Sequence, residues 1–394
     1  MTIDSTQPPG PRVAITGVGA WTRFGPGFKR LWAEALTGTS CLEADGNASA
    51  SDAASRVDGD AADVFALAMG AAREAMREAG LDALPLGAWL VLGTNVGRAN
   101  AIVKHLGKSA QGALRPDALA SWADHSTLAH ALALKLGGDV DRSLAVTGAC
   151  ASGALALGYG RDLITSGRAD VVLAGGADAR SAFKTAGHRL LRSASPTGRA
   201  RPFDLRRDGT VFREGAAFLL LESEAHCLSR GAMPLALLPG VGVGTDLGSL
   251  TAPDSSGRGA MTAMRAALAD ADASPQKIDL VQAHATGTRL NDAMEARVIR
   301  EVFGEHVEGM AVTADKGAIG HTLGACGPLS AALAVRAIRE GCVPPIAACE
   351  EADPECELPL VLKEARTRPI AAALVNSFGF GGGNASIVLR RWEA

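Results

Sequence analysis

Short apolar runs alternate with longer alanine-rich stretches along most of this chain. The runs at 12–20 and 89–92 have the length and composition of buried strands. Between them, residues 63–79 place apolar side chains at helical spacing and are followed by Gly80, a residue type that favours the position just after a helix. This alternation predicts a layered α/β fold.

The second half of the chain repeats the order of elements in the first. It continues with a helix over 258–271 and a strand over 278–282. The segments that echo one another are 16–19 with 235–243, 145–147 with 311–313, and 171–172 with 374–375. We therefore expect two similar halves, 12–230 and 231–394, behind a flexible N-terminal tail over 1–11.

Composition and charge narrow the functional classes. A net charge of −3 argues against a general nucleic-acid-binding surface. The seven cysteines are odd in number and form no C-x-x-C pair, so neither a zinc site nor a disulfide framework is expected, and a reducing cytoplasm fits best. The N-terminus lacks the pattern of a secretory signal, and no apolar stretch is long enough to span a bilayer.

Cys150 lies between a strand-like run at 144–147 and a helix-like run at 153–164, among small residues. A thiol at a helix N-terminus is stabilised as the thiolate, the reactive form. A lone cysteine is more often a buried structural residue, and this segment alone leaves both interpretations open. If the two halves are equivalent, the Cys150 loop faces the Lys316 loop across a pseudo-twofold axis.

Three glycine-rich motifs follow. His284 opens His-Ala-Thr-Gly-Thr directly after a predicted strand, and Asn-Ser-Phe-Gly-Phe-Gly-Gly-Gly-Asn covers 376–384. Between them, Lys316 and His321 belong to Lys-Gly-Ala-Ile-Gly-His-Thr-Leu-Gly-Ala-Cys-Gly. Of the eight histidines, His284 and His321 are the two in Gly/Thr-rich loops after apolar strands. Taken singly, either histidine is more often structural than catalytic.

Together these motifs resemble those of the β-ketoacyl-acyl-carrier-protein synthases, the condensing enzymes of the thiolase fold. The resemblance runs from residue 13 to about residue 389 and includes a fifth block, Arg-Pro-Phe-Asp at 201–204 with Arg-Asp-Gly at 207–209. It implies an α/β, thiolase-like fold of two pseudo-symmetric βαβαβαββ halves in five αβαβα layers. It also implies an acyltransferase with no bound cofactor or metal, whose phosphopantetheine arm is supplied by an acyl carrier protein.

The resemblance assigns a role to each candidate residue. Cys150 takes an acyl group from the carrier as a thioester. His284 and His321, as neutral Nε2 donors, promote decarboxylation of a malonyl-carrier thioester, and the enolate attacks the Cys150 thioester. The backbone N–H groups of Cys150 and Phe380 form the oxyanion hole, and the Phe380 side chain gates the acyl pocket.

Supporting residues surround this centre. Glycines at 379, 381 and 382 permit the backbone path around Phe380. Thr286 and Thr288 contact the phosphopantetheine arm or, equally plausibly, cap their own loop. Lys316 holds the histidines electrostatically and needs a buried carboxylate, for which Asp292 and Glu295 are the candidates. The alternative for both acids is a solvated helix start.

Several positions depart from the fatty-acid members of the family. Ser330 stands where many of them have glutamate, Gly383 where threonine is usual, and Arg213 where glycine is usual. The turn at 138–141 lacks the usual Gly-Pro-Ser. These differences favour a specialised relative, such as a type II polyketide or aryl-polyene synthase, and make the partner of Lys316 less certain.

A basic segment favours a carrier-protein partner. Residues 180–207 contain eight Lys or Arg and one acid, Asp204. Carrier proteins are acidic, so this charge would steer docking. A solvated loop is an equally good interpretation. The family's dimers suggest an apolar interface near residues 128–136, with an identical or a related subunit as partner.

Other activities use the same fold. A thiolase needs a second cysteine in the loop at 376–384, which has none, and starter-type enzymes have asparagine where this chain has His321. An inactive subunit of a heterodimeric synthase usually lacks the nucleophile, whereas Cys150 is present. Acyl transfer from Cys150 to an alcohol or amine stays open.

Overall fold

Ten strands form one continuous path of main-chain pairing in the computed structural model, which describes residues 10–42, 63–102 and 124–394. The order along the path is β4-β3-β5-β6-β1-β7-β13-β12-β8-β9, with β2 attached to β1 and a separate β10-β11 pair. The strands are β1 (Val13–Thr22), β2 (Gly25–Pro26), β3 (Trp89–Gly93), β4 (Ser143–Val146), β5 (Val171–Asp178), β6 (Gly215–Ser223), β7 (Ala236–Thr245), β8 (Leu280–Gln282), β9 (Ala311–Thr313), β10 (Cys342–Val343), β11 (Arg366–Thr367), β12 (Ala372–Phe378) and β13 (Gly383–Arg390).

The path consists of two halves with the same topology. In the first, β4, β3 and β5 are parallel, and β6 and β1 follow antiparallel. In the second, β9, β8 and β12 are parallel, and β13 and β7 follow antiparallel. Two residue pairs, Ala14 with Leu237 and Ile15 with Ala236, join β1 to β7. The echoes in the sequence thus correspond to strands at equivalent places in the two sheets.

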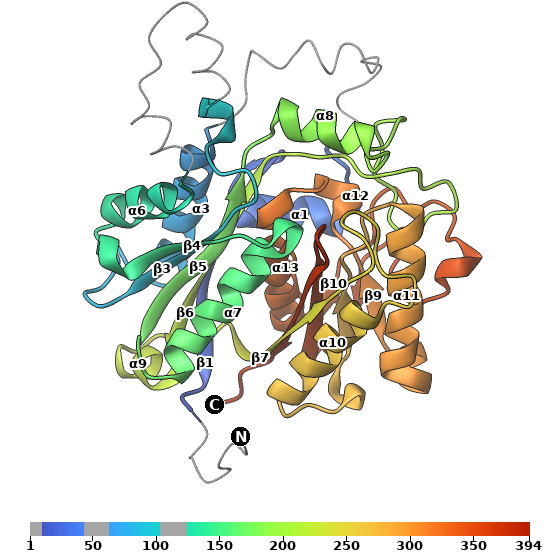
Figure 1. The fold of residues 1–394 in the computed structure, drawn as a ribbon. Helices are drawn as coiled ribbons and strands as arrows, with labels where there is room; N and C mark the ends of the chain where they lie inside the picture. Colours follow the sequence, from blue (N-terminus) through green and yellow to red (C-terminus); the bar gives the residue numbers. More distant parts are fainter. Residues whose placement is uncertain (1–9, 43–62, 103–123) are drawn as a thin grey trace, which may run out of the picture.

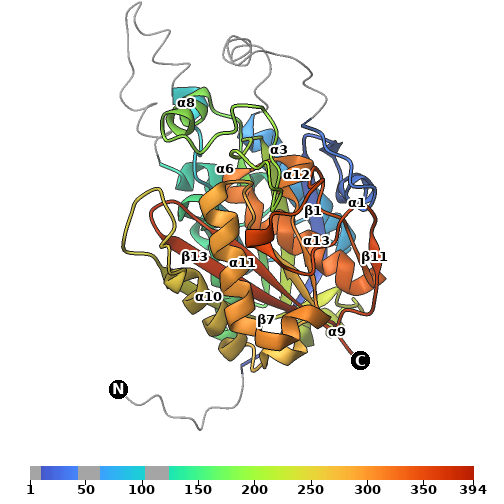
Figure 2. The same ribbon diagram turned by 90° about the vertical axis from the view of Figure 1, so that its right-hand side faces the viewer.

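Helices form the other three layers (Figures 1 and 2). α7 and α13 pack against each other between the two sheets, α3 and α6 cover the outer face of the first, and α10 and α11 cover the outer face of the second. This arrangement confirms the predicted five-layered, thiolase-like fold. The helices are α1 (Phe28–Leu36), α3 (Val64–Glu78), α6 (Ser126–Lys135), α7 (Ser152–Thr165), α8 (Ala182–Leu190), α9 (Glu224–Ser229), α10 (Arg258–Asp270), α11 (Arg289–Phe303), α12 (Lys316–Ile319) and α13 (Cys326–Glu340).

Each sheet is buried on both faces, which explains the continuous apolar runs in the sequence. Along β3, Val91 belongs to the central core, while Leu90 and Leu92 belong to the core beneath α3 and α6. The predicted helix ends are also present. The Asp63 side chain accepts from the backbone N–H of Phe65, and Gly80 has a φ of 76°, in the left-handed region that favours glycine.

Residues 41–60 are rich in Ala, Ser, Asp and Gly, a composition that predicts a surface loop. This segment and the tail at 1–11 lie almost entirely outside the described residues. Of the helices in the described ranges, none has the length and apolar character needed to cross a membrane.

The two halves approach each other closely at the loops that begin α7 and α13. A Cβ at Gly153 would overlap the carbonyl oxygen of Gly324, and a Cβ at Gly327 would lie 2.9 Å from the backbone nitrogen of Ala154. Glycine is therefore required on both sides of this crossing. The crossing brings the Cys150 turn next to the loop that carries His321.

Candidate active site

Cys150 lies at the turn from β4 into α7, as the sequence predicts. Ala149–Ala151 form a single 3-10 turn, Ala149 has a φ of 50°, and α7 begins at Ser152. A positive φ is unfavourable for alanine, so the surrounding structure holds this turn in place. The hydroxyl of Ser377 on β12 donates to the carbonyl oxygen of Cys150 at 3.1 Å. The buried thiol therefore sits at the N-terminus of α7.

The loop between β12 and β13 passes directly beside this turn. A Cβ on Gly379 would lie 3.2 Å from the backbone nitrogen of Cys150, and Gly381 and Gly382 have φ values of 81° and 83°. The backbone N–H groups of Cys150 and Phe380 donate to no other main-chain group of the described chain. Two such donors near a thioester can stabilise a developing oxyanion.

His284 is held by a buried carboxylate. The Glu295 side chain accepts from the backbone N–H groups of His284 and Ala285 at 2.8 and 2.7 Å, and from the amide of Asn376 at 3.0 Å. Burial lowers the pKa of His284 well below its usual value, and Lys316 lowers it further. The imidazole is therefore neutral at pH 7.

His321 has a defined tautomer. Its Nδ1 accepts from the backbone N–H of Leu323 at 3.0 Å, so the proton of a neutral ring resides on Nε2. The rings of His284 and His321 are 5.6 Å apart and nearly perpendicular. Two imidazoles at this spacing can both donate to one substrate oxygen.

The carboxylate beside Lys316 is its neighbour Asp315, which corrects the expectation of Asp292 or Glu295. The Asp315 carboxylate lies 3.7 Å from the Lys316 Nζ, and its other oxygen accepts from Ser330 at 2.6 Å. Burial by itself lowers the pKa of Lys316, but the negative charge of Asp315, with a smaller contribution from Glu295, raises it above its usual value. Lys316 is therefore a buried cation.

Asp292 and Glu295 nevertheless support the site. Asp292 accepts from the backbone N–H groups of Phe203 at 2.9 Å and of Gly287, and both acids are fully buried in α11. They are not a solvated helix start, because their oxygens hold the loop from His284 to Gly287. The residue that replaces the family's glutamate, Ser330, acts by holding Asp315.

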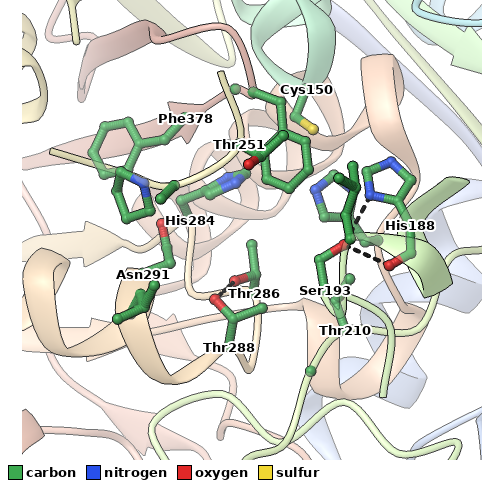
Figure 3. A pocket seen from close by; sticks show the side chains of 18 of the residues that line it. Cys150, His188, Ser193, Thr210, Thr251, His284, Thr286, Thr288, Asn291 and Phe378 are labelled. Atoms are coloured by element: carbon green, nitrogen blue, oxygen red, sulfur yellow. Dashed lines mark hydrogen bonds between the residues drawn. The ribbon is translucent and has the colours of Figure 1, made fainter. Parts of the chain in front are cut away.

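A cavity of about 420 Å³ joins these groups. Cys150, His284 and His321 line it, and Figure 3 shows the sulfur of Cys150 directed into it. Thr286 and Thr288 also line it, and their hydroxyls lie 2.9 Å apart. The Thr288 side chain makes no capping bond at the start of α11, which weighs against the loop-capping role for that residue.

Sequence reasoning missed two rings in this cavity. Phe212 stacks on His188 at 4.0 Å and lies 5.3 Å from the His321 ring. His188 comes from the last turn of α8, within the basic segment and after no apolar strand, so no local pattern distinguishes it.

The described residues contain no group of three or more His, Cys, Asp or Glu side chains that could hold a metal ion.

In the basic segment at 180–207, some arginines form ion pairs within the fold and others are exposed to solvent. Arg207 is buried in an ion pair with Asp353, and Arg206 pairs with Asp204 and Glu350. Arg189 and Arg192 are exposed at the end of α8, close to the cavity mouth.

Comparison with known proteins agrees with this geometry. Residues 55–226 match the family described as "Beta-ketoacyl synthase, N-terminal domain", and residues 235–350 match "Beta-ketoacyl synthase, C-terminal domain". The chain belongs to the β-ketoacyl synthase family. It is therefore a condensing acyltransferase, which confirms the resemblance seen in its motifs.

Individual β-ketoacyl synthase relatives cover nearly the whole chain. Nodulation protein E of Rhizobium sp. (strain N33) is 36% identical over 96% of this chain and 99% of its own. The 3-oxoacyl-[acyl-carrier-protein] synthase 2 of Synechocystis sp. (strain ATCC 27184 / PCC 6803 / Kazusa) is 32% identical over 97% and 98%.

Solved structures of β-ketoacyl synthases superpose closely. One contains a type II PKS acyl-carrier protein in complex with its ketosynthase bound to the hexaketide; it has a TM-score of 0.87 and 26% identity, and covers 97% of this chain and 100% of that one. The ishigamide ketosynthase/chain length factor has a TM-score of 0.85 and 30% identity, over 98% and 100%.

Replacing Asp315 with asparagine tests the Lys316 pair. The change leaves a buried ammonium without its counter-charge, so the free energy of unfolding is expected to fall by about 3–5 kcal/mol. Ser330→Ala, which removes one hydrogen bond but no charge, is expected to cost about 1 kcal/mol. Chemical denaturation of both variants measures this difference. Equal stability of Asp315→Asn and the parent protein would remove Asp315 as the partner.

Proposed function

We propose that this β-ketoacyl synthase accepts an acyl group from an acyl carrier protein on Cys150 and elongates it with malonyl-carrier protein. The observation that carries this proposal is the convergence of one thiol at a helix N-terminus and two histidines, His284 and His321, on a single cavity. The product is a 3-oxoacyl-carrier protein of fatty-acid or polyketide type.

The reaction has three steps. The Cys150 thiolate attacks the acyl thioester, and the phosphopantetheine thiolate leaves. Malonyl-carrier protein then loses CO₂, and the electron pair of the broken bond forms an enolate. The enolate carbon attacks the acyl carbonyl on Cys150, the new carbon–carbon bond forms, and the Cys150 thiolate leaves.

The chain's own groups stabilise negative charge in each step. The N–H groups of Cys150 and Phe380 would bind the tetrahedral oxyanions, and one such donor is worth roughly 3–4 kcal/mol. Nε2–H of His321, joined by His284, would bind the enolate oxygen. Neutral donors suit this role because they do not protonate the enolate that must attack. Lys316 would keep His284 neutral by its nearby positive charge.

The cavity mouth supports docking of a carrier protein. Leu191, Arg192, Leu250, Arg289 and Leu290 line the cavity and are exposed to solvent. An apolar surface bordered by arginines is complementary to an acidic partner that carries its substrate on an arm. Thr286 and Thr288, deeper in the cavity, are placed to hydrogen-bond the amides of that arm.

The proposed function is tested by intact-protein mass spectrometry and product analysis. Incubation with hexanoyl-carrier protein is expected to add one hexanoyl mass, located on the peptide that contains Cys150. Addition of malonyl-carrier protein is then expected to remove that mass and release CO₂ and a 3-oxo-octanoyl-carrier protein. Acyl mass on another residue would overturn the assignment. Transfer of hexanoyl to an added alcohol or amine without CO₂ release would favour acyl transfer instead.

Reversing the charge at the mouth tests carrier docking. Arg192→Glu is expected to raise KM for hexanoyl-carrier protein about tenfold, because it replaces attraction with repulsion of an acidic partner. The KM for hexanoyl-pantetheine is expected to stay unchanged. Arg339→Glu, an exposed site in the last turn of α13, is the matched control and is expected to change neither value. An equal effect of Arg192→Glu on both substrates would argue against docking at this rim.

Dimerisation and location belong to the same proposal. Among the described strands, β4 ends the pairing path and pairs with β3 alone, so its second edge is available to an identical or a related subunit. The apolar residues of α6 that were expected to form this interface, such as Leu128 and Leu132, are buried within the chain, while Leu134 is exposed.

All seven cysteines are free thiols, which supports a cytoplasmic location.

A further inference from the structure

A third histidine faces the cavity that contains Cys150. The His188 side chain is 6% exposed, packs against Phe212, and lies 5.2 Å from the ring of Phe380. In Figure 3 it lies with Ser193 and Thr210 on one side of the pocket, while His284 lies on the other. None of the steps of the proposed condensation uses it.

The contacts of Ser193 leave one nitrogen of His188 unused. Nδ1 of His188 lies 2.9 Å from Ser193 Oγ, and the same hydroxyl lies 3.2 Å from the carbonyl oxygen of His188. The hydroxyl proton can go to either acceptor, so both tautomers of the ring fit these contacts. Nε2, at the far end of the ring from Nδ1, has no hydrogen-bond partner among the described residues and is a donor or an acceptor according to the tautomer.

The ring is neutral at pH 7. Burial, with smaller contributions from nearby His321 and Lys184, lowers the pKa of His188 to about 4. A group with so low a pKa is a poor general base at pH 7 but still forms hydrogen bonds. His188 thus presents a neutral hydrogen-bonding nitrogen to whatever occupies this side of the cavity.

Thr210 is a second residue of the cavity wall whose side chain can form a further hydrogen bond. Its backbone N–H donates to the carbonyl oxygen of Ser193 at 2.9 Å, which places it next to the His188–Ser193 pair. Its hydroxyl is buried and has no hydrogen-bond partner among the described residues. A purely hydrocarbon chain against this wall would leave polar groups unsatisfied, which is energetically costly.

We propose that His188 and Thr210 recognise a hydroxyl group on the acyl chain that Cys150 receives. The hydroxyl forms one hydrogen bond with Nε2 of His188 and one with the Thr210 hydroxyl, donating one of them and accepting the other. This inference rests on the proposed function and names the substrate class of the same site. The selected substrates are hydroxyacyl-carrier thioesters rather than saturated acyl-carrier thioesters.

The test measures kcat/KM for acylation of Cys150 by hexanoyl-, 3-hydroxyhexanoyl- and 5-hydroxyhexanoyl-carrier protein. The parent enzyme is expected to prefer at least one hydroxyacyl substrate about tenfold or more, because a site built around a hydroxyl discriminates strongly against its absence. His188→Phe keeps a flat ring against Phe212 and is expected to abolish that preference. Its kcat/KM for the hexanoyl substrate is expected to be unchanged or higher.

Two further variants separate hydrogen bonding from packing. Thr210→Val keeps the shape of the side chain and is expected to lower only the hydroxyacyl rate. His188→Gln keeps a polar acceptor and is expected to retain part of the preference. Hexanoyl acylation by each variant shows that the protein is folded.

Three outcomes are informative. A parent enzyme without preference for either hydroxyacyl substrate overturns this inference while leaving the proposed function intact. An equal loss with all three substrates in His188→Phe also overturns it, because such a loss indicates contact with the common phosphopantetheine arm. A parent enzyme that is acylated by none of them overturns the proposed function itself.

Discussion

Cys150→Ala is expected to abolish acylation and to lower the condensation rate by about four orders of magnitude or more. Without the sulfur, no atom on the turn before α7 can carry the acyl group between the two half-reactions. Intact-protein mass spectrometry measures acylation, and 3-oxoacyl-carrier product measures condensation. Decarboxylation of malonyl-carrier protein is expected to persist, because it depends on the histidines rather than on the thiol.

A second buried thiol provides the control for this change. Burial raises the pKa of Cys349 to about 12, so at neutral pH it is neither a thiolate nor a competing nucleophile. Cys349→Ala is expected to be acylated at the parent rate. Acyl mass on the Cys150→Ala protein, or its loss in Cys349→Ala, would place the nucleophile elsewhere.

His321→Ala is expected to lower decarboxylation and condensation by about 10²–10³-fold while leaving Cys150 able to take an acyl group. The reason is that Leu323 N–H occupies Nδ1, so the remaining proton on Nε2 is available to stabilise the enolate. Release of labelled CO₂ from malonyl-carrier protein measures the first effect, and the acyl mass on Cys150 measures the second.

The matched control for His321 is a histidine that also bonds to the main chain but lies outside the cavity. Nε2 of His306 lies 2.9 Å from the carbonyl oxygen of Ile278, and His306→Ala is expected to leave decarboxylation unchanged. A His321→Ala protein that no longer acylates Cys150 would show that His321 acts in the first half-reaction instead.

Local sequence patterns were sufficient where a functional residue is positioned by the strand or helix next to it in the chain. The strand before Cys150 and the helix after it are visible in the sequence, as is His284 at the end of a strand. The repeat of the two halves was visible in the echoes of the sequence, and the strand order of the two sheets shows that repeat. These predictions succeeded because each depends on neighbours within about fifteen residues or on a symmetry of the whole chain.

Local patterns failed where a side chain finds its partner through space. The sequence pointed to Asp292 or Glu295 as the partner of Lys316, yet both carboxylates are used by backbone N–H groups of the His284 loop. No sequence pattern points to Asp315, because adjacent residues do not face each other in a regular helix or strand. Here the chain enters a short helix at Lys316, and Ser330 of α13 holds the carboxylate beside the ammonium.

The sequence by itself determined the family, the five-layered fold and the identity of the thiol and the two histidines. It did so because glycines required for close approach, apolar strands and reactive side chains follow one another at fixed spacing. The tertiary structure alone decided which acid neutralises Lys316 and that His188 enters the cavity. The first depends on the packing of α12 against α13, which places Ser330 beside Asp315, and the second on the packing of α8 against Phe212 and the loop that carries Phe380. Packing of that kind leaves no periodic trace in the sequence.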